Sequence, residues 1–174
     1  MEHRGVIKNL AVFYRYELMP FLAGGPGGHV NRFGVIGAAG DRSHEASSQG
    51  DDVWWDKSGV LFAFLIRVDG DPAGFALVAT PPHATRGVQQ RLCDFFVLNR
   101  FRRRGVGKAA ALQIFDRLRG TWELGWVAGN TPAAHFWRSV VSDHTGGRFE
   151  DIQVGMGPDE PSVPGLRFAS EAAG

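Results

Sequence analysis

Residues 102–108 combine two glycines with four cationic side chains in the order Arg102-Arg103-Arg104-Gly105-Val106-Gly107-Lys108. Glycine allows the backbone to turn so that several N–H groups point to one side, and the arginines and the lysine add full positive charges. An apolar stretch precedes this segment, and residues 109–118 follow it with apolar side chains at helical spacing. A glycine turn between a strand and a helix N-terminus is typical of a phosphate site. The sequence therefore predicts a site for a small molecule that carries a pyrophosphate.

The rest of the pattern predicts one α/β domain over residues 1–174 that positions this turn. We expect an amphipathic helix over residues 5–22, then a Gly- and Ser-rich stretch to about residue 52 that Val53-Trp54-Trp55 anchors on the core. Strands over 60–68 and 73–79 flank a turn at Asp69-Gly70-Asp71-Pro72. A sandwich of helices around a mixed sheet is the expected architecture.

The second half of the chain continues with alternating strands and helices. We expect a strand over 91–98, a helix over 108–118 closed by Gly120, and a strand over 122–127. Thr131 is the expected N-cap of the next helix, with Pro132 in its first position. Strands over 148–155 and 165–169 are expected to complete the sheet.

Composition narrows the classes of function. The chain has 19 Lys and Arg against 18 Asp and Glu, so the arginine run is a local feature and a nucleic-acid partner is not expected. The one cysteine, Cys93, excludes an intrachain disulfide, and the histidines lack metal-ligand spacing, so no metal is expected. Without a signal-peptide core or an apolar run long enough for a bilayer, we expect a cytoplasmic protein that does not bind membranes.

Two motifs together resemble a known family. Residues 97–107, which contain Arg102-Arg103-Arg104-Gly105-Val106-Gly107, resemble the acyl-CoA signature Gln/Arg-x-x-Gly-x-Gly/Ala of the GNAT superfamily of N-acyltransferases. Residues 130–137 resemble the second signature of that family, Asn-x-x-Ala-x-x-Phe-Tyr. The resemblance implies a mixed, mostly antiparallel sheet of six to seven strands, with a splayed pair of central strands and about four flanking helices.

The resemblance also implies a cofactor, acetyl-CoA, and a set of residues that bind it. Backbone N–H groups of residues 103–108 would cradle the pyrophosphate, while Arg102, Arg103, Arg104 and Lys108 would neutralise it. The strand before the loop would carry a bulge, and pantetheine would pair with its backbone. Residues on the strand and on the later helix complete the implied site: Phe96, Val97, Leu98, Gly105, Val106, Gly107, Asn130, Ala133, Phe136 and Trp137.

The implied reaction is direct attack of a primary amine on the thioester, and its acid and base are not given by the motifs. Many relatives place a tyrosine after the phenylalanine as a general acid, whereas this chain has Trp137, which cannot donate a proton near neutral pH. Candidates for the general base are Asp94, Glu123, His135 and Glu150, of which Asp94 and Glu123 are favoured because they lie on the central strands. The alternative for Asp94 is a side chain on the opposite face of the strand, satisfied by a turn or by Arg91.

The acceptor is expected to be a small molecule rather than a protein, because the chain is compact. In the family, the first helices and the loop between them select the acceptor, so Tyr14, Tyr16, Trp54 and Trp55 are candidate pocket walls. Aromatic side chains at helical spacing also fit an ordinary core. Family members often dimerise, so the resemblance allows a homodimer, but no part of the sequence indicates an interface.

Three other functions remain as alternatives. A non-catalytic acyl-CoA sensor or structural module would explain the missing tyrosine. A dinucleotide-binding oxidoreductase would explain Gly-x-Gly-x-x-Ala at residues 105–110, but too few residues follow to complete a doubly wound sheet. An RNA-binding module would use the arginine run, but aromatic stacking platforms are not found beside it.

Overall fold

The computed structural model describes residues 2–22, 30–37, 40–44, 52–57, 59–155 and 161–171. In these ranges one mixed sheet has the strand order β1-β2-β3-β4-β6-β5. Its strands are β1 (Leu61–Val68), β2 (Asp71–Ala79), β3 (Gln90–Val97), β4 (Gly120–Gly125), β5 (Phe149–Val154) and β6 (Val163–Ser170). Neighbouring strands are antiparallel except β3 and β4, which are parallel. The expected mixed, mostly antiparallel sheet is confirmed.

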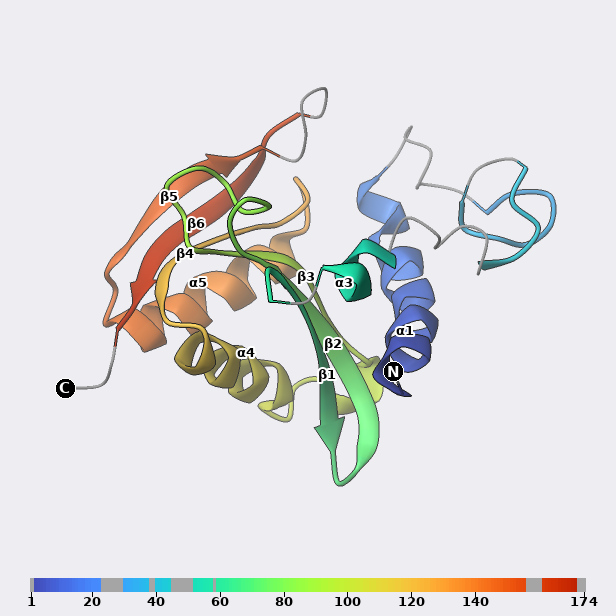
Figure 1. Ribbon diagram of the computed structural model, residues 1–174, viewed down its shortest axis with the longest axis horizontal. Coiled ribbons are helices and arrows are strands. Elements are labelled where there is room, and N and C mark those ends of the chain that lie inside the picture. Colours follow the sequence, from blue (N-terminus) through green and yellow to red (C-terminus); the bar gives the residue numbers. More distant parts are fainter. Residues whose placement is uncertain are drawn as a thin grey trace.

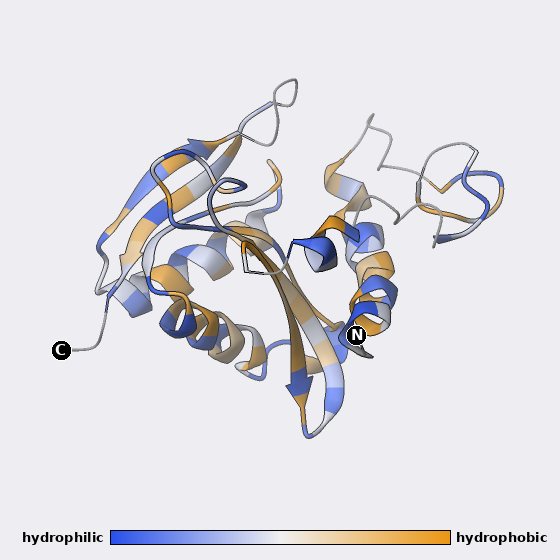
Figure 2. Ribbon diagram, in the orientation of Figure 1, coloured by the Kyte–Doolittle hydropathy of each residue, from blue (hydrophilic) through white to orange (hydrophobic). Residues whose placement is uncertain are grey.

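Helices cover both faces of this sheet (Figure 1). Helix α1 (Glu2–Leu18) lies on one side of the β1–β3 arm, followed by a 3-10 turn, η1 (Met19–Phe21). Helices α4 (Val106–Arg117) and α5 (Thr131–Thr145) lie on the other side, and a short 3-10 turn, η3 (Asn99–Phe101), leads from β3 toward α4. The helices alternate apolar and polar residues, while β1–β3 are largely apolar, as expected for strands covered on both faces (Figure 2).

Three apolar clusters lie between these layers in the described residues, and the two largest include side chains of α1 and of α4 and α5. Ile7 and Leu10 of α1 pack on Phe75, Leu77 and Phe96 of the sheet. The short helix α3 (Val53–Asp56) adds Trp54 and Trp55 to this cluster, which confirms the expected anchor. The larger cluster lies between the sheet and helices α4 and α5, and its fully buried side chains include those of Trp122, Phe115, Leu124 and Leu166.

The two central strands part after a short pairing. Strand β3 pairs with β4 only at Gln90–Trp122, Arg91–Glu123 and Leu92–Leu124. Beyond Leu92, β3 continues to Val97 alongside β2, while β4 continues alongside β6. Among the described residues, no strand pairs with the carboxyl end of β3 on its β4 side, which confirms the splayed central pair.

Two predicted helix boundaries were wrong. The C-cap of α4 is Leu118, whose N–H donates to the Ile114 carbonyl, and Gly120 instead begins β4 opposite Ser170. The N-cap of α5 is Asn130 rather than Thr131, because the Asn130 side chain accepts a hydrogen bond from the Ala133 N–H. Asparagine is at least as good as threonine in this position.

Candidate active site

The turn between β3 and α4 contains two residues with left-handed backbone. Arg103 has φ +57° and Gly105 has φ +79°. Left-handed residues turn the chain sharply, so that backbone N–H groups of the turn can point to one side and meet an anion. A non-glycine residue in this region costs about 1 kcal/mol, and such strain concentrates at functional sites. The glycine was predicted from the sequence, whereas nothing in the residue type of Arg103 indicates its conformation.

The N-terminus of α4 is open to an anion. Gly105 is its N-cap and provides no side-chain hydrogen bond. The Gly105 carbonyl accepts from the Ala109 N–H at 2.9 Å, so the amides of residues 106–108 precede the helical ladder. The helix dipole adds partial positive charge at the same place. This geometry agrees with the predicted pyrophosphate site.

The four cations of the turn fall into two groups. The Arg102 guanidinium is held in place, since its Nε donates to the Val97 carbonyl at 2.6 Å and its Nη2 pairs with Glu17 at 2.5 Å. Lys108 pairs with Asp143 of α5 at 2.6 Å, but both side chains are about half exposed. Exposed pairs contribute at most about 1 kcal/mol, so a phosphate can replace Asp143.

Arg103 and Arg104 form the second group. Both are exposed, and no ion pair joins either of them to a carboxylate within the part of the chain that the structure describes. These two guanidinium groups are therefore the ones placed to meet a phosphate in solution.

The backbone of β3 presents alternate residues to the splay. The Leu98 N–H donates to the Ala73 carbonyl at 2.8 Å, which makes these two residues a hydrogen-bonded pair. Such pairs alternate with non-hydrogen-bonded pairs in antiparallel strands, so Phe96 also bonds to β2. Phe95 and Val97 therefore direct their N–H groups away from β2.

This register bears on which backbone groups of β3 could meet pantetheine. Phe96 and Leu98 use their backbone groups for β2, so only Val97 of the three predicted residues presents its N–H to the splay. Phe95 was missed, although its position two residues before Val97 gives the same backbone direction. Phe95 and Val97 are the residues whose backbone faces the splay.

The second motif closes the site from α5. The side-chain oxygen of Asn130 accepts a hydrogen bond from the Ala133 N–H at 3.2 Å. The N–H groups of the same side-chain amide are left for a ligand. Phe136 stacks on Phe95 with ring centroids 6.0 Å apart. Its ring also lies where a Cβ on Gly107 would meet it at 3.3 Å, so glycine permits α4 and α5 to approach closely.

A β-bulge on β3 turns Asp94 to the α1 side. Leu77 pairs with Asp94 and Val78 with Leu92, so Cys93 is an extra residue between them. Regular alternation would place Asp94 on the face of Leu92, which lies in the core beside α4 and α5. The bulge instead brings both Cys93 and Asp94 to the face covered by α1.

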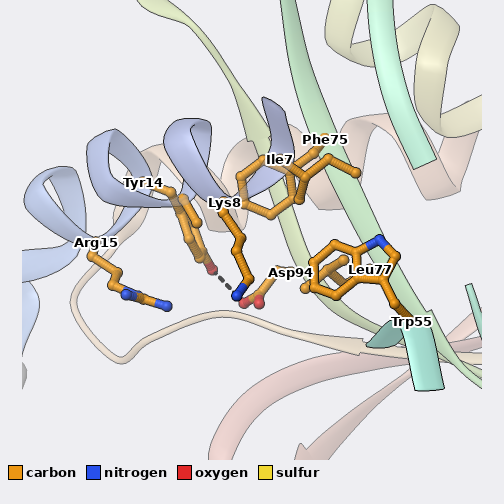
Figure 3. A pocket seen from close by; sticks show the side chains of 9 residues that line it. Ile7, Lys8, Tyr14, Arg15, Trp55, Phe75, Leu77 and Asp94 are labelled. Carbon is orange, nitrogen blue, oxygen red and sulfur yellow. Dashed lines mark hydrogen bonds between the residues drawn. The ribbon is translucent and has the colours of Figure 1, made fainter. Parts of the chain in front are cut away.

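Asp94 lies in a cavity of about 200 Å³ between α1, α3 and the sheet. The Tyr14 hydroxyl donates to its carboxylate at 3.0 Å (Figure 3). Burial, and then the negative charge of Asp94, raise the pKa of Tyr14 well above its usual value, so Tyr14 keeps its proton. The full lining is Ile7, Lys8, Ala11, Tyr14, Arg15, Trp55, Phe75, Leu77 and Asp94. A carboxylate held by a neutral donor is an arrangement that can accept a proton.

Two of the predicted pocket walls, Tyr14 and Trp55, line this cavity. Trp54 packs in the apolar cluster beneath α1, and Tyr16 is 63% exposed. The part of the predicted acceptor loop at residues 23–29, 38–39 and 45–51 lies outside the described residues.

Residues 36–140 match the family model described as the acetyltransferase (GNAT) family. The chain belongs to this family. It is similar in structure to a putative GNAT acetyltransferase from Desulfovibrio desulfuricans, with a TM-score of 0.57, 14% identity, and coverage of 93% of this chain and 92% of that one. It is also similar to an acetyltransferase from Thermus thermophilus, with a TM-score of 0.56, 15% identity, and coverage of 89% of this chain and 90% of that one. No curated protein matches the sequence.

A third similar structure is the ribosomal-protein-S18-alanine N-acetyltransferase from Escherichia coli, with a TM-score of 0.50, 17% identity, and coverage of 71% of this chain and 78% of that one. At these identities the likeness concerns the fold alone. GNAT proteins use acyl-CoA. No helix in the described ranges is long and apolar enough to span a membrane.

Glu123 and Trp137 are held within the packed interior by their neighbours. Glu123 is 1% exposed and accepts from the Thr85 hydroxyl at 2.6 Å and from Arg167 at 3.1 Å. It also lies in the paired part of β3 and β4 rather than in the splay. Trp137 is a core side chain packed edge-on against Phe95. The geometry therefore gives Glu123 a structural role and leaves Asp94 as the base candidate.

Proposed function

We propose that this protein transfers an acetyl group from acetyl-CoA to the primary amine of a small molecule by direct attack on the thioester. One observation carries the proposal: the bulge at Cys93 turns Asp94 into a cavity on the α1 side of the same strand whose gap-facing backbone and following loop form the acyl-CoA site. In this proposal the donor and the acceptor bind on opposite sides of β3, and the amine reaches the thioester past this strand.

The residues of this chain fit the donor. In this proposal the amides of residues 106–108 and the left-handed turn before them hold the pyrophosphate, with Arg103 and Arg104 beside them. The N–H groups of Phe95 and Val97 and the amide of Asn130 are placed for the pantetheine arm. Bound there, acetyl-CoA supplies an activated acyl group.

Asp94 supplies the base that the reaction requires. An amine with a pKa of about 10.4 is neutral in about one molecule in 10³ at pH 7, which is a handicap of roughly 4–5 kcal/mol. Asp94 accepts the proton of the amine, while the Tyr14 hydroxyl fixes the direction of the carboxylate. The Val97 N–H is placed to stabilise the developing oxyanion.

Protonation of the departing thiolate needs no dedicated acid in this proposal. A free thiol has a pKa of roughly 8.5, so the thiolate is a tolerable leaving group near neutral pH. Trp137 replaces the usual tyrosine and is buried, which leaves water as the proton source. We expect slower turnover than in relatives with the tyrosine, and not a loss of turnover.

Calorimetric titration of acetyl-CoA, followed by an assay of thiol release with a panel of amines, tests the proposal. Micromolar binding with amine-dependent thiol release supports acetyl transfer. Binding without release for every amine would support the alternative, an acyl-CoA-binding module without catalysis. No binding by the folded protein would refute both.

A further inference from the structure

Strand β1 is an edge of the sheet that lacks the usual protection against pairing. In the described residues β1 pairs with β2 on one side, and no strand pairs with its other side. Its sequence, LFAFLIRV, is apolar except for one charge, Arg67 (Figure 2). Natural edge strands are normally interrupted by charges, prolines or bulges, because their free N–H and C=O groups attract other strands. Strand β5 at the opposite edge follows this rule with Glu150 and Asp151.

The free side of β1 presents its backbone groups in a regular pattern. The Thr80 N–H donates to the Val60 carbonyl at 2.8 Å, so the even-numbered residues from 60 onward bond to β2. This register runs without a break as far as Ile66. The N–H and C=O groups of Ala63 and Leu65 therefore point away from β2, to the free side.

An apolar groove of about 720 Å³ lies between this strand and α4. Phe64 and Ile66 line it, and so does Leu65, whose side chain packs with the cluster on the other face of the sheet. The groove therefore reaches round the free edge of the strand. Phe64 and Leu65 are only partly buried, so this edge has apolar surface that a further strand would cover.

The charges beside the groove are self-complementary. The guanidinium carbon of Arg117 lies 5.9 Å from the ring centroid of Phe64, and Asp116 also lines the groove. A two-fold axis at Phe64 would bring Asp116 and Arg117 of both copies to one place, where each arginine meets a carboxylate of the second copy. The same axis would pair Ala63 with Leu65 of the second copy, which are the residues with free backbone groups.

We propose that two copies of this chain associate through β1, in an antiparallel pair centred on Phe64 that joins their two sheets. The Phe64 rings of the two copies meet across the axis on the α4 face, where an aromatic pair adds to the strand pairing. The inference is independent of the proposed function, since it uses neither Asp94 nor the turn before α4.

Sedimentation velocity over about 1–100 µM protein measures this association, and we expect a dimer within that range. Ala63→Pro removes an N–H on the free side and keeps the bonds to β2, so it should weaken dimerisation by about tenfold or more. Arg117→Asp should weaken it about tenfold, and the double variant Asp116→Arg/Arg117→Asp should restore it. Arg148→Asp, just before the opposite edge strand β5, is the matched charge control.

Cysteine variants test the register of the pair. Phe64→Cys places two thiols at the axis, in a non-hydrogen-bonded pair with Cα atoms about 4.5 Å apart, which suits a disulfide. Phe62→Cys is the matched control, since it would lie opposite Ile66 of the second copy and far from its own counterpart. With oxidised glutathione as the oxidant and Cys93→Ala in both variants, we expect a linked dimer of Phe64→Cys alone.

The outcomes decide the proposal in either direction. A dimer that Ala63→Pro and Arg117→Asp weaken, and that the charge swap restores, supports it. A monomer up to about 100 µM, a dimer that neither variant weakens, or equally fast linking of both cysteine variants overturns it. If circular dichroism shows that Ala63→Pro does not fold, the charge variants and the cysteine variants decide alone.

Discussion

Asp94 and Glu123 are acidic residues on neighbouring strands, and their surroundings give them different chemistry. Both oxygens of Glu123 accept hydrogen bonds, one from Thr85 and one from Arg167, so this carboxylate ties the loop before β3 to β6. Asp94 lines a cavity and accepts a hydrogen bond from a tyrosine that stays neutral. Only Asp94 is placed where an amine can approach.

Asp94→Asn keeps the shape of this side chain and removes its capacity to accept a proton. We expect kcat for the preferred amine to fall by about 10²–10⁴, the range for loss of a general base. The Kd for acetyl-CoA, which in the proposed function binds on the other side of β3, should stay within about twofold. A kcat within threefold of the wild type would remove Asp94 from the mechanism.

Glu123→Gln is the matched comparison on the adjacent strand. It weakens two hydrogen bonds of a buried carboxylate, so we expect a loss of about 1–3 kcal/mol in the free energy of unfolding. Denaturant unfolding measures this loss. If instead kcat fell as far as in Asp94→Asn with stability unchanged, Glu123 would be the base.

Cys93 is a second residue whose surroundings set its chemistry. Burial, and then the charge of Asp94, raise the pKa of its thiol from 9.0 to about 11. At pH 8 we therefore expect a thiol reagent to label folded protein roughly 100-fold more slowly than denatured protein. Labelling at equal rates in both states would show that the thiol is not protected.

The same shift has a consequence for stability. The folded state keeps the Cys93 proton at pH values where the unfolded chain has lost it. This contribution to stability is complete below about pH 9 and is lost as the pH rises to about 11. Unfolding of Cys93→Ala should therefore depend less on pH over this interval than unfolding of the wild type.

At the scale of the elements, the positions of turns and helices could be predicted from the residue types within each segment. The turn at Asp69-Gly70 was predicted, and both residues have left-handed backbone in the structure. The glycine loop and the helix after it were predicted for the same reason, although α4 begins at Val106, two residues before the expected start.

The bulge at Cys93 was not predictable from residues 92–98 themselves. A strand buried on both faces shows no alternation, so its sequence does not reveal which residue is left without a partner. The partner of Asp94 was also hidden, because Tyr14 lies 80 residues earlier in the chain. Such contacts depend on the packing of α1 on the sheet and not on any local pattern.

A substitution at Gly105 tests whether the backbone shape of the loop before α4 is needed for acetyl-CoA binding. An alanine at φ +79° costs about 1 kcal/mol, although the space around its Cβ is open. We expect Gly105→Ala to weaken acetyl-CoA binding about tenfold in calorimetry, since the amides of the turn and of the first residues of α4 would be redirected. Gly70→Ala, at φ +87° in the β1–β2 turn and also in open space, is the control with equal strain.

The two variants are compared by stability and by affinity. Similar losses of stability are expected in both, with the loss of affinity confined to Gly105→Ala. If Gly70→Ala weakened binding equally, the effect would come from destabilisation and not from the shape of the loop.

At the scale of the whole molecule, acetyl-CoA is expected to contact elements from both parts of the sheet. A ligand at 100 times its Kd adds about 2.7 kcal/mol to the stability of the folded state. For a chain of this length we expect the Tm to rise by roughly 5–10 °C in a thermal unfolding scan. NAD at the same concentration should not raise the Tm, and a rise with NAD instead of acetyl-CoA would favour the dinucleotide-binding alternative.

The short junction between β3 and β4 has a mechanical consequence. Three parallel residue pairs join a unit of β1–β3 with α1 to a unit of β4–β6, whereas each antiparallel pair of neighbouring strands shares six to eight residue pairs. The junction is thus the most compliant line in the sheet. A pantetheine arm lying along β3 would connect the two units across this junction. The enzyme would then reach its full stiffness only when the donor substrate is bound.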